Sequence, residues 1–335
     1  MLLAIPALSL LFLQNRQVQT MVSQYVAERL SEELQTSISL SSVNYSFFKR
    51  IQVRDLYIED LYGDTLLYSE LTKLRIKQFR PERRRIEIRK MTLENAFVNF
   101  VIDSSNVVNL AFITNRIRKP HVPPERKSML IISSVDLLNS RFSLSKMIKV
   151  PVESGVNFTD LHLNNLEITV EDLISSMDTV HMDITKLTGT EISGFDIGML
   201  TSHMSLGKRH LHFYDMEIKT EGSDLDIPDL RFNFQDYKRF RHFSREVDLQ
   251  FTSDQSHLKL ADLSYFVPGI KGILDRITID GSINGMLSDM RGEELFVTFD
   301  DVSSLAFDFV MIGLPDFKNT FLNFNFRELN TTVMA

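Results

Sequence analysis

The chain has 335 residues, a formal net charge of −7, 43% hydrophobic residues and 24% charged residues. These values are ordinary for a globular protein and exclude a chain that is mainly disordered or collagen-like. The chain has no cysteine, which excludes disulfides, thiolate nucleophiles and cysteine-bound metals. Tryptophan is also absent, whereas phenylalanine is frequent, at 25 residues.

The charge is unevenly distributed. Residues 1–120 hold 17 Lys and Arg against 12 Asp and Glu, which leaves 20 against 32 for residues 121–335. This division disfavours an evenly basic nucleic-acid-binding protein. The basic cluster Arg80–Lys90 is interpreted as a solvated face or loop, with contact to anionic lipid headgroups as the alternative.

The first segment is apolar but short. Residues 2–13 contain one polar residue, Ser9, and as a helix they would extend about 18 Å, against a bilayer core of about 30 Å. No basic region precedes the segment and no small-residue cleavage motif follows it, so it does not match a signal peptide. We interpret residues 1–14 as a truncated transmembrane anchor, with a buried N-terminal helix as the alternative. The anchor residues are Leu2, Leu3, Ile5, Leu8, Leu10, Leu11, Phe12 and Leu13.

Residues 15–37 have the spacing of an amphipathic helix. Apolar residues recur three and four positions apart, at Val18, Met21, Val22, Tyr25, Val26, Leu30 and Leu34. We expect this helix to cap the end of the sheet that follows.

Over residues 38–335 apolar residues recur at every second position, which predicts strands. The predicted strands are 51–60, 66–79, 86–103, 129–144, 156–170, 179–187, 197–205, 211–220, 225–234, 247–251, 277–283, 295–299, 305–311 and 321–329. Because few helical segments intervene, we expect an antiparallel meander in a mainly β fold.

Phenylalanines follow the alternation, as in Phe232 and Phe234 around Asn233, so one face of many strands is apolar. Besides residues 18–36, only Asn106–Arg118 and Ala261–Val267 read as helical, which is too little to cover that face. The sheet either closes on itself, as sandwiches or a barrel, or forms an open groove that holds acyl chains.

Signals for chemistry are weak. His210 and His212 are spaced like a metal pair but lack a third ligand at a motif distance, and we interpret them as solvent-facing. Asp224, Asp226 and Asp229 are interpreted as an acidic turn and edge strand, because the order of a calcium loop is missing. No nucleophile, phosphate-binding or zinc-protease motif is present. We therefore predict no enzyme activity, catalytic residue, metal or cofactor.

Several segments carry a family resemblance. They are Leu30–Leu34 (LSEEL), Ile38–Val43 (ISLSSV), Phe47 and Phe48, Asp55–Tyr68 (DLYIEDLYGDTLLY), Asp262–Pro268 (DLSYFVP), Ile279–Gly285 (IDGSING) and Ile312–Asp316 (IGLPD). In this order, helix, hairpin and repeated strands, the chain resembles the N-terminal region of AsmA-like proteins of the TamB type in Gram-negative bacteria.

The resemblance implies a single-pass anchor in the inner membrane, a periplasmic body and a long, curled, taco-like β-sheet with an apolar groove. Members of this family are associated with outer-membrane biogenesis, as bridges that carry phospholipid or as partners of a BamA-like outer-membrane barrel in protein assembly and secretion. The chain departs from the family in its truncated anchor and in lacking the C-terminal domain that would meet the outer-membrane partner.

We therefore expect a non-enzymatic phospholipid conduit between the two membranes, with no nucleic-acid partner. The predicted groove residues are Phe97, Val101, Phe232, Phe234, Phe251, Phe299, Phe307, Phe309, Phe324 and Phe326. Ordinary core packing of these side chains is the alternative. A scaffold that captures segments of outer-membrane proteins at its sheet edges is the second hypothesis, and an adhesin or solenoid is a third.

Overall fold

The fold is seen in a computed structural model, which describes residues 20–21, 24–25, 27–28, 31–32, 34–46, 50–80, 85–105, 107–112, 129–175, 179–267, 270, 272, 275–299 and 303–331. The prediction of a mainly β, mostly antiparallel protein is confirmed. The chain divides into two compact units. The first comprises Met1–Val150 and Phe158–Leu173, and the second comprises Pro151–Asn157 and Ile174–Ala335.

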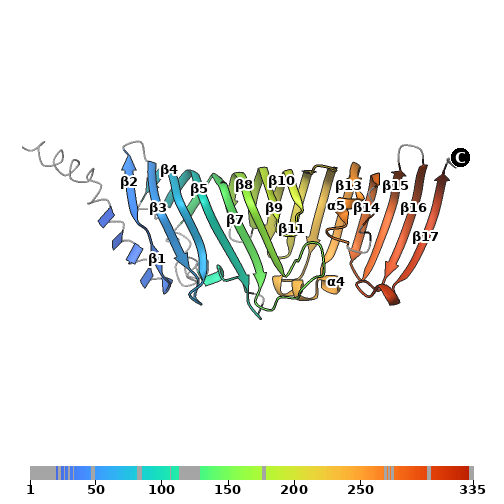
Figure 1. The fold of residues 1–335 in the computed structure, drawn as a ribbon, viewed down its shortest axis with the longest axis horizontal. Coiled ribbons are helices and arrows are strands. Elements are labelled where there is room, and N and C mark those ends of the chain that lie inside the picture. The colour runs from blue at the N-terminus through green and yellow to red at the C-terminus, as the bar shows by residue number, and fades with distance from the viewer. Residues whose placement is uncertain are drawn as a thin grey trace, which may run out of the picture. The chain divides into compact units, whose positions relative to one another are not determined.

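The first unit is an open sheet whose strands lie side by side (Figure 1). Its strands are β1 (Ile38–Ser39), β2 (Ser42–Ser46), β3 (Arg50–Glu59), β4 (Thr65–Arg80), β5 (Arg85–Ile102), β6 (Met129–Ile132), β7 (Ser134–Lys146) and β8 (Asp160–Ser175). Both β1 and β2 pair with β3, and β3, β4 and β5 follow as antiparallel neighbours. β8 pairs antiparallel with β7.

One pairing differs from the expected meander, because β5 runs parallel to β6 and β7. A parallel neighbour requires the chain to travel back along the sheet before it pairs again. The chain between β5 and β6 is residues 103–128, of which 103–105 and 107–112 are described. Of the helix expected at 106–118, residues 111–112 are helical, residues 107–110 form a bridge and a turn, and the remainder lies outside the described residues.

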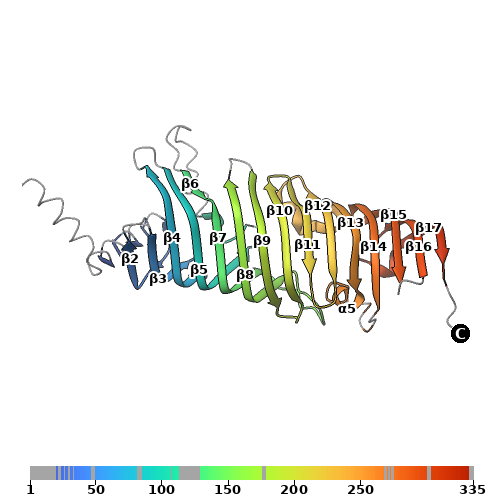
Figure 2. The same ribbon diagram turned by 90° about the horizontal axis from the view of Figure 1, so that it is seen from above.

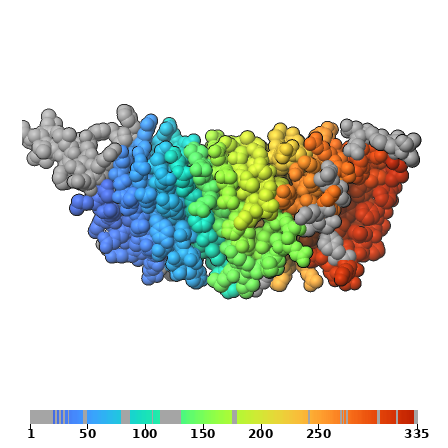
Figure 3. All heavy atoms as spheres, in the orientation of Figure 1, coloured from blue at the N-terminus to red at the C-terminus, as the bar shows by residue number. Residues whose placement is uncertain are grey.

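The second unit is a meander in which every strand pairs antiparallel with the next (Figures 1 and 2). Its strands are β9 (Thr179–Glu191), β10 (Asp196–Gly207), β11 (His210–Lys219), β12 (Asp224–Asn233), β13 (Asp248–Lys259), β14 (Arg276–Met286), β15 (Asp289–Phe299), β16 (Ser303–Ile312) and β17 (Phe321–Asn330). In the space-filling view, the colours of β14 to β17 follow one another in chain order (Figure 3).

The described helices of the second unit are short and lie in connections between strands. They are η3 (Tyr237–His242), α4 (Phe243–Glu246), α5 (Leu260–Leu263) and η5 (Phe317–Asn319). Asp236 caps η3 by accepting a hydrogen bond from the Lys238 amide, 2.8 Å away. The helix expected at 261–267 is therefore the single turn α5 followed by turn residues, and η3 with α4 was not anticipated.

Several strands differ from their predicted bounds, and β15 begins six residues earlier than expected, at Asp289. The strand expected at 129–144 is divided at Ser133 into β6 and β7, and β13 runs eight residues further than expected, to Lys259. β8 begins at Asp160 and not at Val156, because the Val156 amide donates a hydrogen bond to the Tyr265 carbonyl instead, at 2.8 Å.

The predicted anchor, residues 1–14, lies outside the described residues. The described residues from 20 to 34 are helical. Near the end of this helix the Ser31 hydroxyl donates to the Ala27 carbonyl and accepts from the Ile38 amide, and Thr36 Oγ1 donates to the Glu59 carbonyl, at 2.7 Å. Among the described residues, no helix combines the length and apolar character needed to cross a bilayer.

Candidate functional site

The second unit carries a continuous apolar face. Residues directly opposite each other in antiparallel strands point to the same face, so the registers define rows that cross all nine strands. The first row is Met182, Met204, Phe213, Leu230, Phe251, Ile283, Gly292, Phe309 and Phe324. The second row is Val180, Leu206, Leu211, Phe232, Leu249, Gly285, Met290, Met311 and Leu322. Each row extends about 38 Å, at about 4.8 Å per strand.

The row between these two points to the opposite face and is polar at eight of its nine positions. It consists of His181, Ser205, His212, Arg231, Gln250, Asn284, Arg291, Val310 and Asn323. The second unit is thus a sheet with one apolar side and one polar side.

The apolar face is only partly shielded. Phe232, Phe251 and Phe309 are neither buried nor fully exposed, and Phe324 and Phe326 on β17 are 44% and 56% exposed. Side chains that remain half-accessible in the middle of a sheet are shielded by their neighbours on the sheet and not by a second layer.

A local aromatic cluster covers one end of β12. Phe232 lies 6.0 Å from Phe243, and Phe234 lies 5.2 Å from Tyr237 and 4.9 Å from Phe240, measured between ring centroids. Phe234 is consequently buried, at 5% exposure. The connection containing η3 and α4 therefore caps this end of the apolar face.

The strands keep their apolar side chains on one face through a repeated kink. Asp55, Asn95, Asn139, Asn165, Asp215, Gln255 and Glu294 have positive φ angles, between 42° and 54°. Asn and Asp tolerate this left-handed conformation better than other residues with a Cβ. At most of these kinks two apolar residues are three positions apart instead of two, as in Val53 and Leu56 or Phe213 and Met216, and around Gln255 the corresponding pair is Ser253 and Ser256. The kink shifts the alternation by one residue and bends the strand.

In the first unit, side chains connect the kinks of adjacent strands. The side-chain amide of Asn95 donates a hydrogen bond to Glu70 Oε2 at 2.7 Å. The side-chain amide of Asn139 donates to Asn95 Oδ1 at 2.6 Å. Asp55 accepts hydrogen bonds from Ser41 at 2.6 Å and from Tyr68 at 3.3 Å. The pKa of Tyr68 is raised, first by desolvation and then by the negative charge of Asp55.

Small residues line the apolar side of the kinks. The most buried are Ser69, Ala96, Ser140, Ser202, Ser253 and Ser256, all at most 4% exposed. Their hydroxyl groups are hydrogen-bonded, as in the Ala96 amide donating to Ser140 Oγ at 3.2 Å. Small side chains leave room for a strand to bend toward this face.

The structure places seven of the ten predicted groove residues on the apolar face of the second unit. Besides the row members Phe232, Phe251, Phe309 and Phe324, Phe307 lies opposite both Leu295 and Phe326, and Phe299 lies opposite Ile277. Phe234 is in the buried cluster next to this face.

The two predicted residues of the first unit lie elsewhere. Phe97 is opposite Tyr68 and Arg141, with the Arg141 guanidinium 5.2 Å from its ring centroid, so it belongs to the polar face. Val101 follows Phe97 at an interval of four and lines a 270 Å³ pocket with Asn109 and Met147. The apolar row of this unit is instead Ile58, Leu67, Val98, Phe142 and Leu163. The kink at Asn95 was the missed signal, because it changes which residues of β5 share a face.

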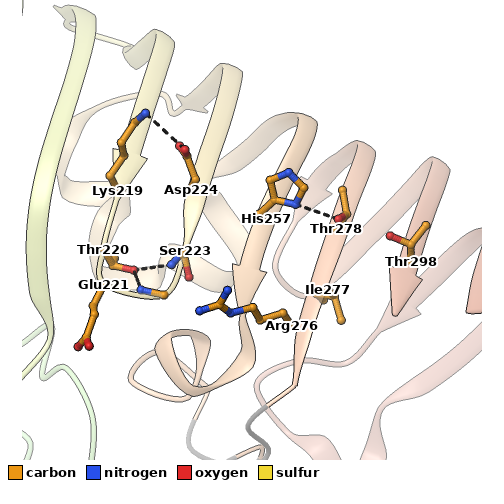
Figure 4. A pocket seen from close by; sticks show the side chains of 11 residues that line it. Lys219, Thr220, Glu221, Ser223, Asp224, His257, Arg276, Ile277, Thr278 and Thr298 are labelled. Atoms are coloured by element: carbon orange, nitrogen blue, oxygen red, sulfur yellow. Dashed lines mark hydrogen bonds and ion pairs between the residues drawn. The ribbon is translucent and has the colours of Figure 1, made fainter. Parts of the chain in front are cut away.

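A pocket of about 550 Å³ lies on the polar side of the second unit (Figure 4). Lys219 and Asp224 form an ion pair across it at 3.3 Å, and His257 Nδ1 lies 3.0 Å from Thr278 Oγ1. The Thr220 hydroxyl accepts from the amide of Ser223, which closes the turn. These side chains are engaged with each other, and they include no nucleophile paired with a base.

The histidines and aspartates singled out in the sequence form local pairs. His212 Nε2 lies 2.6 Å from Asp229 Oδ1, and His210 Nε2 lies 3.0 Å from Ser205 Oγ. β12, which carries the three aspartates, pairs on both sides, so its interpretation as an edge strand was wrong. Within the described part of the chain, no group of three metal-ligating side chains is close enough to hold a metal ion.

The chain was compared with known proteins. It matches no protein-family model, and no curated protein matches it in sequence.

Proposed function

We propose that the protein is a non-enzymatic conduit for phospholipid between the inner and outer membranes, in which acyl chains lie along the apolar face. The observation that carries this proposal is the pair of apolar rows that cross nine consecutive strands without a polar side chain. Within the bend such a face forms a groove, with lipid headgroups at its open edge in water.

The energetics require such a continuous surface. Each acyl methylene costs about 0.8 kcal/mol to expose to water, so a chain of about 16 methylenes costs about 13 kcal/mol. A face of Phe, Leu, Ile and Met offers similar solvation at every strand, so a lipid can move along it without a deep trap. An anchor in the inner membrane and a periplasmic location are part of the same proposal.

Adjacent residues of β17 provide the test. Phe324 points to the apolar face and Asn325 points away from it, and both are exposed. We expect Phe324→Glu to reduce phospholipid binding and transfer between vesicles, whereas Asn325→Glu leaves both unchanged. Native mass spectrometry of detergent-free protein should show co-purified phospholipid in the wild type. Equal lipid binding by the two variants, with both folded by circular dichroism, would contradict the proposal.

A scaffold for outer-membrane protein assembly, working with a BamA-like barrel, is the second candidate. β17 favours it, because all ten of its residues are exposed and, within the second unit, its described register is with β16 alone. An exposed strand edge can pair with an extended segment of another protein. Proline at Asn323 or Asn325 should then abolish crosslinking to such a segment while sparing lipid binding.

A further inference from the structure

The polar face of the first unit carries cations directly opposite each other. Arg50 on β3 is opposite Arg75 on β4, and Arg75 is opposite Lys90 on β5. Directly opposed like charges on neighbouring strands destabilise a sheet. Lys90 is compensated by Asp136, at 2.6 Å, but among the described residues neither arginine has a carboxylate within ion-pair distance.

The same face continues this pattern. Arg54 lies four residues after Arg50, on the same face of β3. It is exposed and has no ion-pair partner among the described residues. Lys73 is paired with Glu94, and Lys77 with Glu87 at 3.5 Å. Lys73, Lys77 and Lys90 are thus in ion pairs, with Glu94, Glu87 and Asp136, whereas Arg50, Arg54 and Arg75 are in none among the described residues. The nearby carboxylate of Asp55 accepts hydrogen bonds from Ser41 and Tyr68.

The surroundings of the arginines suit phosphate oxygens. Ser42 is opposite Arg54, and Asn44 is opposite Gln52, so neutral polar groups stand beside the guanidinium groups. Guanidinium groups bind phosphate through two parallel hydrogen bonds and are weakly hydrated, which favours interfaces. Because the strands present them on an open sheet surface, they match an extended layer of phosphates better than one enclosed phosphate.

We propose that this basic face, defined by Arg50, Arg54 and Arg75, binds the anionic headgroups of a phospholipid bilayer. Charge complementarity supports a bilayer, because cations spread over the outer surface of an open sheet are attracted to an extended surface of negative potential. A nucleic acid presents phosphates too, and competition with duplex DNA distinguishes it from a bilayer. This contact is separate from the apolar face, which lies on the other side of the same strands, so it does not depend on lipid transport.

The absence of native cysteine allows a direct test. Gln52→Cys places a single solvatochromic dye between Arg50 and Arg54, and Asn323→Cys places the same dye on the exposed polar face of the second unit. With the full chain, vesicles containing phosphatidylglycerol should shift the emission of the dye at 52, whereas pure phosphatidylcholine vesicles should not. The dye at 323 should respond little to either. An equal response at 52 to both vesicles, or at both sites, would overturn the proposal.

A matched pair of charge variants completes the test. Arg50→Gln with Arg75→Gln should weaken the charge-dependent part of vesicle binding about 30-fold at low salt, at roughly fivefold per arginine. Arg276→Gln with Arg291→Gln removes the same charge from exposed arginines of the second unit and should have little effect. Equal loss in both variants, or displacement of the vesicles by duplex DNA at equal phosphate concentration, would overturn the proposal. The free energy of unfolding of the Arg50→Gln, Arg75→Gln variant should be unchanged or slightly higher, since opposed like charges are removed.

Discussion

Each unit has an apolar face of its own, and the polar faces of the two units differ in composition. In the first unit, rows such as Ile58, Leu67, Val98 and Phe142 are apolar, as are the long rows of the second. The polar face of the first unit aligns Arg50 with Arg75 and Lys90, whereas the second unit alternates histidine, arginine, glutamine and asparagine. Both units therefore present an apolar face, and they differ in how densely cations face each other on the polar face.

The units also build their kinks differently. In the first unit the kink residues are Asp55, Asn95, Asn139 and Asn165, and side chains connect some of them between strands. In the second unit Asp215 has this conformation too, but Gln255 and Glu294 also adopt it, and their longer side chains stabilise it less well. The first unit is thus expected to depend more strongly on the identity of its kink residues.

The largest effect on stability is expected at a fully buried side chain of the apolar face. Leu166 is 1% exposed, and Leu166→Ala should lower the free energy of unfolding by about 3 kcal/mol, through lost burial and the cavity that remains. Leu163 lies on the same apolar face but is only half-buried, so Leu163→Ala should cost clearly less. Urea unfolding measures both. Equal losses would mean that the face is covered, which contradicts an open surface.

The second-largest effect on stability is expected at the kink residue of β5, Asn95. Asn95→Val places a β-branched residue at φ 49° and removes hydrogen bonds to Glu70 and Asn139, so it should destabilise by about 2 kcal/mol. Glycine adopts this conformation without strain, so Asn95→Gly should destabilise less than Asn95→Val. In the second unit, Gln255→Asn should instead stabilise by a few tenths of a kcal/mol. Denaturant midpoints test the comparison, which fails if valine and glycine at position 95 behave alike.

A smaller effect is expected where a ring packs against glycine in the first apolar row. A Cβ at Gly292 would lie 2.3 Å from Phe309 Cε1, so Gly292→Ala should displace that ring and cost about 1 kcal/mol. Phe309→Leu in the same chain should recover part of the loss. Thermal unfolding of the single and double variants measures this coupling. Additive losses would show that Phe309 does not occupy the space above Gly292.

Period-two patterning was sufficient to predict most strands, because apolar side chains alternate along β11 to β17. The face of each residue was not predictable from parity alone, because Asn95 and its equivalents shift the alternation by one. An apolar pair three residues apart around Asn or Asp, as in Leu93 and Ala96, is the sequence signal for this shift. The parallel pairing of β5 with β7 had no such signal, since parallel and antiparallel strands share the same period.

The smallest effect is a pH dependence confined to the first unit. The pKa of Asp160 is lowered from its ordinary value of 3.8, mainly by the hydrogen bond from Lys149, at 2.7 Å, with desolvation opposing it and His162 adding a smaller contribution. A lowered carboxyl pKa in the folded state stabilises the fold above the ordinary value and loses that contribution as the pH falls through the folded-state pKa. Lys149→Ala should therefore cost a few tenths of a kcal/mol near pH 7, after allowance for solvent screening, and less as the pH falls through the folded-state pKa of Asp160. Lys146→Ala removes a neighbouring charge without a described ion pair and should show no such pH dependence. Thermal unfolding of the two variants across this pH range decides between them, and a Lys149 effect that persists at low pH would show that its methylene packing, and not its charge, stabilises the connection between β7 and β8.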